Sequence, residues 1–271
     1  LQDVASRHFG VDAAAVEIAN LQYREALVLP EDGARVVQTI LTPLDATTAE
    51  VKLLSTAEQG EAGWRTHILG MLRVQHDAAP RPTAVHAGEA IDVEAYYAAI
   101  RPTGLGYGPL FRGITELRRG AGEALSRVVA RIGGDALHPA LLDACLHVYP
   151  VLAEATGADL LAALEARRPG FLPIGMERFR SVAGGVPEGT TVVVQARRRP
   201  GGGETVTLDI DIVRADGGWL ATMEGLAVRP VPPEAVRPIA PATGAATPDW
   251  LYEVRWEESP PLPPAEPSGG P

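Results

Sequence analysis

The sequence predicts an α+β fold, in which a few helices are combined with antiparallel sheet. Stretches with strand character follow one another directly, without the regular alternation with helices that an α/β fold requires. The clearest example is residues 64–74, where Trp64, Ile68 and Leu72 share one face of an alternating pattern. No glycine motif for dinucleotides or phosphates is present, and Lys52 is the single lysine, which excludes the nucleotide-binding α/β folds.

The first part of the chain is expected to form the end of a helix and four strands. Residues 1–9 have the pattern of a helix that ends at Gly10, because glycine is favoured just after a helix. Strands are predicted at residues 16–29, 34–43, 49–57 and 64–74. Turns with a glycine at residues 31–33 and 59–61 indicate antiparallel hairpins.

The second part repeats this organisation. A short helix is predicted at residues 93–100 and a second helix at residues 138–156. Strands are predicted at residues 111–119, 123–132, 171–182, 190–198, 204–214 and 219–230. Pro173, inside one of these strands, indicates a sheet edge or a β-bulge, because proline cannot donate a backbone hydrogen bond. Each half is therefore expected to combine a helix with an antiparallel sheet.

Proline-rich stretches divide the chain. Two prolines and small side chains at residues 77–83 mark a connector, and 12 of the 24 prolines lie in the last 42 residues. We therefore expect a first half at residues 1–76, a connector at 77–90, a second half at 91–230 and a linker at 231–271. Within the linker, residues 250–256 alternate large and polar side chains, which fits either a short docking strand or an apolar linker segment.

Composition and charge exclude several classes of protein. The net charge of −10 argues against nucleic-acid binding, which requires a basic surface. A single cysteine, Cys145, cannot form a disulfide framework or a thiolate metal site. The sequence has neither an apolar run of about 20 residues nor a secretory leader, so we expect a cytoplasmic protein without a membrane span. It also lacks an initiator methionine, so we expect a piece of a longer protein or a processed product.

Residues 138–147 carry the strongest candidate chemistry. Asp143 and His147 are four residues apart, which places both on one face of a helix that begins at Pro139. Their neighbours are mostly apolar, and such an environment raises the pKa of a carboxyl group and suits it to act as a general acid. The alternative is an Asp–His pair on the surface of an amphipathic helix. The spacing does not match a metal site.

A loop at residues 104–113 combines glycines with Tyr107 and Phe111. It fits either a ligand-binding loop, because glycine permits close backbone approach, or a turn packed by the two aromatic rings. Cys145 lies among apolar residues of a helix, so we expect it in the core. No serine lies in the Gly-x-Ser-x-Gly frame of a nucleophile elbow, which argues against that kind of hydrolase.

Together these stretches resemble the dehydratase domain of modular type I polyketide synthases. The resemblance rests on His-Pro-Ala-Leu-Leu-Asp at residues 138–143 with His147 four residues further on. It also rests on Tyr-Gly-Pro-Leu-Phe-Arg-Gly at residues 107–113 and on Leu172 with Pro173. The order and separation of these motifs make the set specific, and the resemblance covers nearly the whole chain.

This resemblance implies a double hotdog, in which two long helices are each wrapped by a curved antiparallel sheet. The implied reaction removes water from a 3-hydroxyacyl thioester carried on an acyl carrier protein, without a cofactor or metal. Asp143 and His147 are the implied catalytic pair: Asp143 gives a proton to the leaving hydroxyl, and His147 holds Asp143 in place. The residues implied to bind the substrate are Tyr107, Gly108, Pro109, Phe111, Pro139, Leu142, Leu172 and Pro173.

The resemblance also implies partners. These are the acyl carrier protein, neighbouring synthase domains and a second copy of the domain in a homodimer. Docking of the carrier protein would need local arginines, for which Arg112, Arg118 and Arg119 are the candidates.

The sequence departs from the family at the catalytic base. The family takes the α-proton with the histidine of a His-x-x-x-Gly-x-x-x-x-Pro motif, which is absent here, the nearest stretch being residues 67–70. Either the chain begins after that histidine or the base has been lost. Three functions stay open: a dehydratase, a non-catalytic docking or structural module of the same fold, and a domain that forms rings or moves double bonds.

Overall fold

The computed structural model describes residues 1–27, 35–56, 63–75, 80–103, 106–134, 137–153, 160–166, 170–182, 184–201 and 203–231. All of them belong to one compact unit, Leu1–Arg237. The turns predicted at residues 31–33 and 59–61 and the segment at residues 250–256 fall outside the described residues.

The first part of the chain forms the helix and the four strands that the sequence predicts. Helix α1 (Gln2–Phe9) ends at Gly10. A 3₁₀ turn (Ala13–Ala15) leads into the strands, which are β1 (Val16–Tyr23), β2 (Val37–Pro43), β3 (Thr48–Thr56) and β4 (Trp64–Val74). Strand β1 is shorter than the predicted strand at residues 16–29.

The second part begins with helix α2 (Val93–Ile100), which matches the predicted range. Its start is capped by the side chain of Asp92, which accepts a hydrogen bond from the N–H of Ala95 at 2.8 Å. The predicted strands are β6 (Ile114–Arg119), β7 (Glu123–Val129), β8 (Phe171–Ser181), β9 (Thr191–Arg198), β10 (Val206–Arg214) and β11 (Trp219–Pro230). The sequence pattern does not predict β5 (Glu89–Ile91) or α5 (Leu160–Ala166), because each is too short to show a period.

The prediction of one continuous helix at residues 138–156 is wrong. The described residues there form two helices, α3 (Pro139–Leu146) and α4 (Tyr149–Ala153), with a turn between them. Pro150 explains the break, because proline has no N–H and its ring would clash with the carbonyl four residues earlier. Short helices therefore stand where the family resemblance implies a long one. No helix in the described ranges is long and apolar enough to cross a lipid bilayer.

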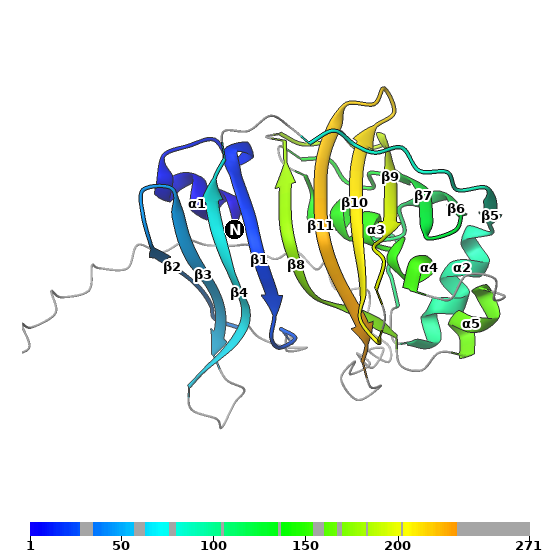
Figure 1. The fold of residues 1–271 in the computed structure, drawn as a ribbon, viewed down its shortest axis with the longest axis horizontal. Helices are drawn as coiled ribbons and strands as arrows, with labels where there is room; N and C mark the ends of the chain where they lie inside the picture. The colour runs from blue at the N-terminus through cyan, green and yellow to red at the C-terminus, as the bar shows by residue number, and fades with distance from the viewer. Residues whose placement is uncertain are drawn as a thin grey trace, which may run out of the picture. The chain divides into compact units, whose positions relative to one another are not determined.

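The strands form one 11-stranded antiparallel sheet in the order β2-β3-β4-β1-β8-β11-β10-β9-β7-β6-β5 (Figure 1). The two parts of the chain meet where β1 pairs with β8, with Ile18 opposite Phe179 and Leu21 opposite Met176. Helix α1 packs against β1 and β4, and helices α3 and α4 pack against β7. Each part of the chain thus contributes a helix layer and a share of the same sheet.

Pro173 lies where β8 loses a partner. Strand β1 pairs with β8 from Gly175 to Phe179, so Pro173 extends beyond β1. On the other side of β8, the register with β11 shifts between Ala227 and Val228, next to the pairing with Pro173. Of the two alternatives predicted for this proline, the bulge is confirmed, whereas β8 is an inner strand of the sheet between β1 and β11.

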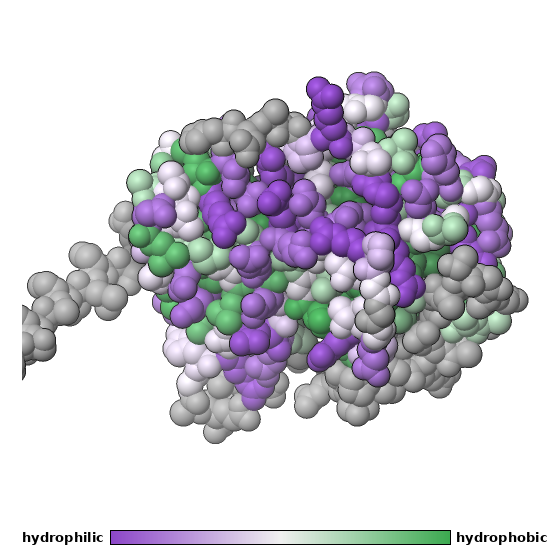
Figure 2. Space-filling view, viewed as in Figure 1, coloured by the Kyte–Doolittle hydropathy of each residue, from purple (hydrophilic) through white to green (hydrophobic). Residues whose placement is uncertain are grey.

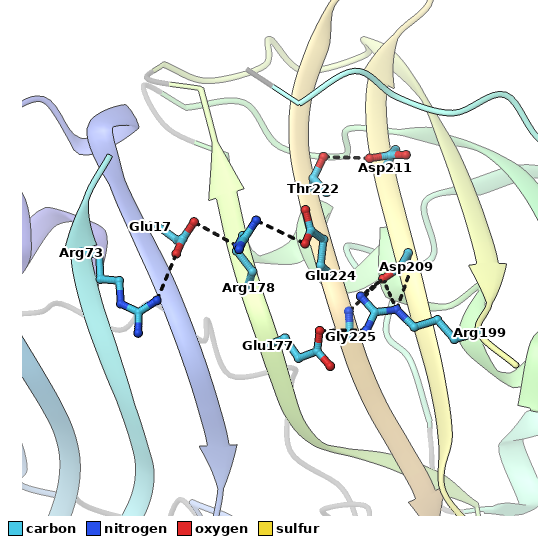
Figure 3. A network of polar contacts seen from close by, with 10 residues as sticks. All are labelled: Glu17, Arg73, Glu177, Arg178, Arg199, Asp209, Asp211, Thr222, Glu224 and Gly225. Atoms are coloured by element: carbon cyan, nitrogen blue, oxygen red, sulfur yellow. Dashed lines mark hydrogen bonds and ion pairs between the residues drawn. The ribbon is translucent and has the colours of Figure 1, made fainter. Parts of the chain in front are cut away.

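A chain of charged side chains crosses the sheet from one part to the other (Figure 3). Glu17 in β1 is only 2% exposed, and its carboxylate lies 3.2 Å from Nε of Arg178 in β8 and 4.0 Å from Nη1 of Arg73 in β4. Arg178 also lies 3.5 Å from Glu224 in β11. Figure 2 shows hydrophilic residues across this side of the sheet. The charged chain therefore spans four adjacent strands.

A second charged group surrounds Asp209 in β10 (Figure 3). Nε of Arg199 donates to both carboxylate oxygens of Asp209, at 3.0 and 2.9 Å, and Nη1 of Arg199 donates to Glu177 at 2.8 Å. The N–H of Gly225 donates to Asp209 at 2.9 Å. Gly225 has a φ of +63°, a left-handed conformation that favours glycine, and a Cβ there would lie 2.4 Å from Cδ of Glu177, whose side chain would have to move.

The connector between the two parts is fixed to the sheet by Asp211. This residue of β10 is 4% exposed and accepts hydrogen bonds from the N–H of Thr83 at 3.3 Å, from Arg197 at 3.0 Å and from Thr222 at 2.8 Å. Arg197 also donates to the carbonyl of Thr83. Figure 1 shows the connector passing over β11 and β10 on its way to β5.

Candidate active site

Helix α3 carries the Asp–His pair. His138 caps the helix by accepting a hydrogen bond at Nδ1 from the N–H of Ala140 at 3.1 Å, and Pro139 occupies the first turn. The helix then brings Nε2 of His147 to 3.0 Å from Oδ2 of Asp143, so the two side chains share one face as their spacing predicts. In the described residues, no group of three or more His, Cys, Asp or Glu side chains is placed to hold a metal ion.

His147 is buried and is held at several atoms. Its side chain is 1% exposed. Oη of Tyr97 lies 3.2 Å from Nδ1, and the ring of Tyr107 packs on the imidazole with 3.7 Å between ring centres. The hydroxyl of Tyr96 donates to the backbone carbonyl of His147. These contacts fix the position of the ring that touches Asp143.

Asp143 is partly exposed. Its side chain is 41% exposed and that of His147 is 1% exposed, so the pair matches neither an enclosed apolar environment nor a fully exposed surface pair. Helical periodicity gives the reason: Leu141, Ala144 and Cys145 are buried in the core stripe of α3, and Asp143 lies outside that stripe. Cys145 is in the core as predicted, and burial raises the pKa of its thiol. The position of Asp143 therefore depends on His147 rather than on an apolar pocket.

Tyr107 is anchored on its other side by a second tyrosine. Its hydroxyl donates to the hydroxyl of Tyr149, which donates in turn to the carbonyl of Phe171 at 2.9 Å. Burial raises the pKa of both phenols well above the ordinary value, so both keep their protons. This chain of hydroxyls ties the loop of Tyr107 to the first residue of β8.

Gly113 sets how closely this loop approaches the helix. A Cβ at this position would lie 2.8 Å from Cγ1 of Val128, 2.9 Å from the carbonyl oxygen of Val129 and 3.1 Å from Cβ of Ala144. The backbone of the loop therefore packs directly against β7 and α3. This close approach brings Tyr107 to the ring of His147.

Two adjoining cavities open beside the loop, with volumes of about 430 and 470 Å³. They share Tyr97, Tyr107 and Arg112 in their walls. Gly108 lines the first cavity and Pro109 lines the second. Three of the predicted substrate-binding residues thus line a cavity, namely Tyr107, Gly108 and Pro109.

The other predicted substrate-binding residues lie on three elements. Phe111 is 39% exposed on the same loop, and Pro139 and Leu142 lie on α3 before Asp143. Leu172 and Pro173 are partly buried in β8, directly after the Phe171 carbonyl that binds Tyr149. The structure brings Tyr107, His147 and Asp143 together, and it places Leu172 and Pro173 on the strand to which Tyr107 is tied.

Tyr97 is a site residue that the sequence analysis does not identify. It comes from α2 and contacts His147 across 50 residues of sequence. Burial raises the pKa of Tyr97 to about 12. The guanidinium of Arg112 lies 4.7 Å from its ring centre and pairs with Glu94 at 2.6 Å. The signal in the sequence is the Tyr96–Tyr97 pair in an apolar helix, because buried phenols need hydrogen-bond partners.

The three arginines expected to dock a carrier protein each lie in an ion pair. Arg118 pairs with Glu116 at 2.7 Å, and Arg119 pairs with Glu89 at 2.7 Å. Arg112 pairs with Glu94 as described above. Their positive charge is therefore partly balanced within the domain.

The fold defines the class of protein, a double hotdog of the kind seen in solved dehydratase domains. The dehydratase domain from the CurF module of curacin polyketide synthase matches with a TM-score of 0.69 and 23% identity, over 84% of this chain and 80% of that chain. The CurK dehydratase, in an inactive mutant with Asp replaced by Asn, matches with a TM-score of 0.65 and 25% identity, over 80% of this chain and 76% of that chain.

Sequence comparison gives the family. Residues 75–238 match the family described as the polyketide synthase dehydratase N-terminal domain, so the chain belongs to the polyketide synthase dehydratases. Mycoketide-CoA synthase of Mycobacterium tuberculosis is 30% identical in an alignment of length 249 residues that covers 86% of this chain and 5% of that protein. Polyketide synthase GfsB of Streptomyces halstedii is 31% identical in an alignment of length 245 residues that covers 85% of this chain and 4% of that protein. The chain thus spans a small part of the length of these multidomain relatives.

Proposed function

We propose that this domain removes water from a 3-hydroxyacyl chain held as a thioester on an acyl carrier protein. The α C–H bond and the β C–O bond break, a C=C bond forms, and the products are an enoyl thioester and water. The observation that carries the proposal is the carboxyl group of Asp143, 3.0 Å from His147 and 41% exposed. Membership of the dehydratase family supports the same reaction.

Asp143 is the proton donor in this proposal. Hydroxide is a poor leaving group, so the β C–O bond breaks readily only when the oxygen receives a proton. A positioned general acid contributes a factor of about 10²–10⁴ to such a step. Oδ2 of Asp143 contacts His147, and Oδ1 has no hydrogen-bond partner in the described residues. Oδ1 is therefore the oxygen that can face a substrate.

The loop around Tyr107 supplies the substrate wall in this proposal. The two cavities of about 430 and 470 Å³ lie in the size range of about 300–1,000 Å³ that is common for small-molecule sites. Gly108 and Pro109 line them, and Phe111 follows on the same loop. Pro139 and Leu142 on α3 and Leu172 and Pro173 on β8 belong to the proposed wall as well, although none of the four lines either cavity.

The reaction also needs a base, because a proton must leave the α-carbon. The thioester carbonyl acidifies this carbon, so a histidine is strong enough. His67 is held by Ser55 at 2.8 Å and by the carbonyl of Glu25 at 3.0 Å. His138 caps α3. We assign neither as the base, and the experiment includes the same domain together with any synthase sequence encoded before Leu1.

The test is mass spectrometry of a 3-hydroxyacyl-pantetheine thioester incubated with the chain and with its extended form. We expect loss of one water in at least one form, and a decrease of about 10²-fold or more in Asp143→Asn of that form. Asp3→Asn is the matched control, because Asp3 is 66% exposed on α1.

Equal rates of water loss in wild type and Asp143→Asn would show that Asp143 is not the proton donor. No water loss in either form would overturn dehydration. A substrate with a distal hydroxyl would then test ring formation, and binding to carrier protein alone would test the docking module.

A further inference from the structure

Tyr97 contacts the ring nitrogen of His147 that faces away from Asp143. Its Oη lies 3.2 Å from Nδ1, whereas Nε2 lies 3.0 Å from Oδ2 of Asp143. The imidazole therefore stands between a phenol and a carboxyl group. A neutral imidazole carries its proton on one of its two nitrogens, so the partner of one nitrogen decides what the other can do.

The neighbours of Tyr97 set the direction of its hydrogen bond. The backbone N–H of Ile114 donates to the Tyr97 oxygen, which leaves the phenol proton to point at Nδ1. Burial raises the pKa of Tyr97 to about 12, although the guanidinium of Arg112 beside its ring acts to lower it. The phenol therefore keeps its proton at neutral pH and can donate it in a hydrogen bond.

We propose that Tyr97 is a positioning residue that holds His147 in the tautomer with its proton on Nε2. This inference rests on the proposed function of Asp143. Nδ1 of His147 accepts from Tyr97, and the Nε2 proton is donated to Oδ2 of Asp143. The transferable proton of Asp143 then sits on Oδ1, the oxygen with no partner in the described part of the chain.

The opposite tautomer would withhold this proton from the substrate. With a proton on Nδ1, Nε2 becomes an acceptor, and the carboxyl group of Asp143 donates to His147 instead. The proton needed by the leaving hydroxyl is then held inside the pair. In the Ser–His–Asp triad, loss of the correct tautomer costs about 10⁴ in kcat, which indicates how strongly such control can act.

Tyr96 provides a matched comparison on the same helix. Its hydroxyl donates to the backbone carbonyl of His147, so Tyr96 holds the backbone of this residue and makes no hydrogen bond to its ring nitrogens. Tyr96→Phe and Tyr97→Phe remove the same atom from adjacent positions of α2. Only Tyr97→Phe removes the donor to Nδ1.

The first experiment reads the tautomer directly. ¹⁵N NMR of the chain labelled at histidine is recorded for wild type, Tyr96→Phe and Tyr97→Phe, and His147→Gln identifies the His147 signals. We expect a protonated Nε2 in wild type and Tyr96→Phe, and a population with a protonated Nδ1 in Tyr97→Phe. A protonated Nδ1 in wild type, or identical His147 spectra in wild type and Tyr97→Phe, would overturn the inference.

The second experiment is a double-mutant cycle on the rate of water loss. We expect Tyr97→Phe to lower kcat by about 10- to 100-fold with little change in KM. A decrease of this size is common when a residue that orients a functional side chain is replaced. In the His147→Gln background, the same change should cost less than about threefold, because an amide has no tautomer to fix. An equal cost in both backgrounds would show a merely structural role and would contradict the inference. Tyr23→Phe, exposed in β1, is the activity control.

The two experiments separate this inference from the proposed function. If no form of the wild-type domain removes water, the proposed function fails, and the NMR spectra still decide whether Tyr97 sets the tautomer. If wild type removes water and the spectra do not respond to Tyr97→Phe, the inference fails and the proposed function stands.

Discussion

Glu17 in β1 and Arg178 in β8 form an ion pair at the junction between the two parts of the sheet, with 3.2 Å between Oε2 and Nε. Glu17 is almost fully buried, whereas the side chain of Arg178 is 48% exposed. The buried carboxylate therefore depends on partly exposed arginines for its stabilisation.

We expect Glu17→Gln to lower the free energy of unfolding by about 1–3 kcal/mol, because the substitution removes a buried charge partner. Urea unfolding measures the change. The control is Asp3→Asn, since the pair of Asp3 with Arg7 is 66% and 69% exposed and should contribute less than about 1 kcal/mol. Equal losses in the two variants would contradict a special role for the buried pair.

Asp209 should make stability depend on pH. Burial acts to raise its pKa, but hydrogen bonds from Arg199 and Gly225 outweigh burial, so the pKa lies below its ordinary value. A group whose pKa is lower when folded contributes stability above its unfolded pKa and loses it as pH falls through the folded pKa. Asp209→Asn should therefore be less stable than wild type at pH 7, with a difference that shrinks below about pH 4. Thermal unfolding at several pH values tests this, and a constant difference would contradict it.

The close approach at Gly113 should tolerate no side chain. Gly113→Ala would force a Cβ to within 2.9 Å of the Val129 carbonyl, so we expect a loss of about 1–3 kcal/mol of stability. The loop of Tyr107 would also move away from His147, which should slow water loss. Gly88→Ala is the control, because a Cβ at Gly88 would meet no atom within 4 Å. Wild-type stability in Gly113→Ala would rule out this packing.

The helix break after α3 should matter for catalysis. Pro150→Ala supplies an N–H, so we expect α3 to continue toward α4 and the carbonyl of His147 to exchange Tyr96 for a helical partner. A shift of His147 by about 1 Å is expected to slow water loss by about 10- to 100-fold. Circular dichroism and rate measurements check both parts. If the helix content rises and the rate of water loss does not change, the break between α3 and α4 does not position His147.

Charge reversal tests carrier docking. If Arg118 and Arg119 meet an acidic carrier protein, Arg118→Glu and Arg119→Glu should weaken binding, and the loss should decrease as salt is added. Binding is measured by titration calorimetry, with Lys52→Glu in β3 as the control for net charge. Unchanged binding would exclude this surface as the docking site.

Strand positions are predicted well because alternation is local. Strand β4 matches residues 64–74 and β11 matches residues 219–230, since each shows its pattern within its own sequence. The three residues of β5 carry no pattern and depend on pairing with β6. A long strand can thus be predicted from its own alternating residues, whereas a short edge strand such as β5 forms because a neighbouring strand pairs with it.

The site is only partly predictable from sequence. The spacing of Asp143 and His147 predicts their contact, because both lie in one helix. The burial of His147 depends on Tyr97 and Tyr107, which the chain brings in from α2 and a separate loop. The exposure of Asp143 likewise depends on which face of α3 meets the core. Such contacts arise from tertiary packing, which local patterns do not encode.

The backbone hydrogen bonds between β1 and β8 have a mechanical consequence. Opening the two halves like a clamshell would break the pairing of Ile18, Ala19, Leu21 and Gln22 with β8. Such an opening would therefore cost backbone hydrogen bonds of the sheet. In the proposed reaction, we expect an acyl chain to enter beside the loop at residues 106–113 without separation of the two parts. Under this proposal, we expect the size of the accepted substrate to depend on the side chains of that loop.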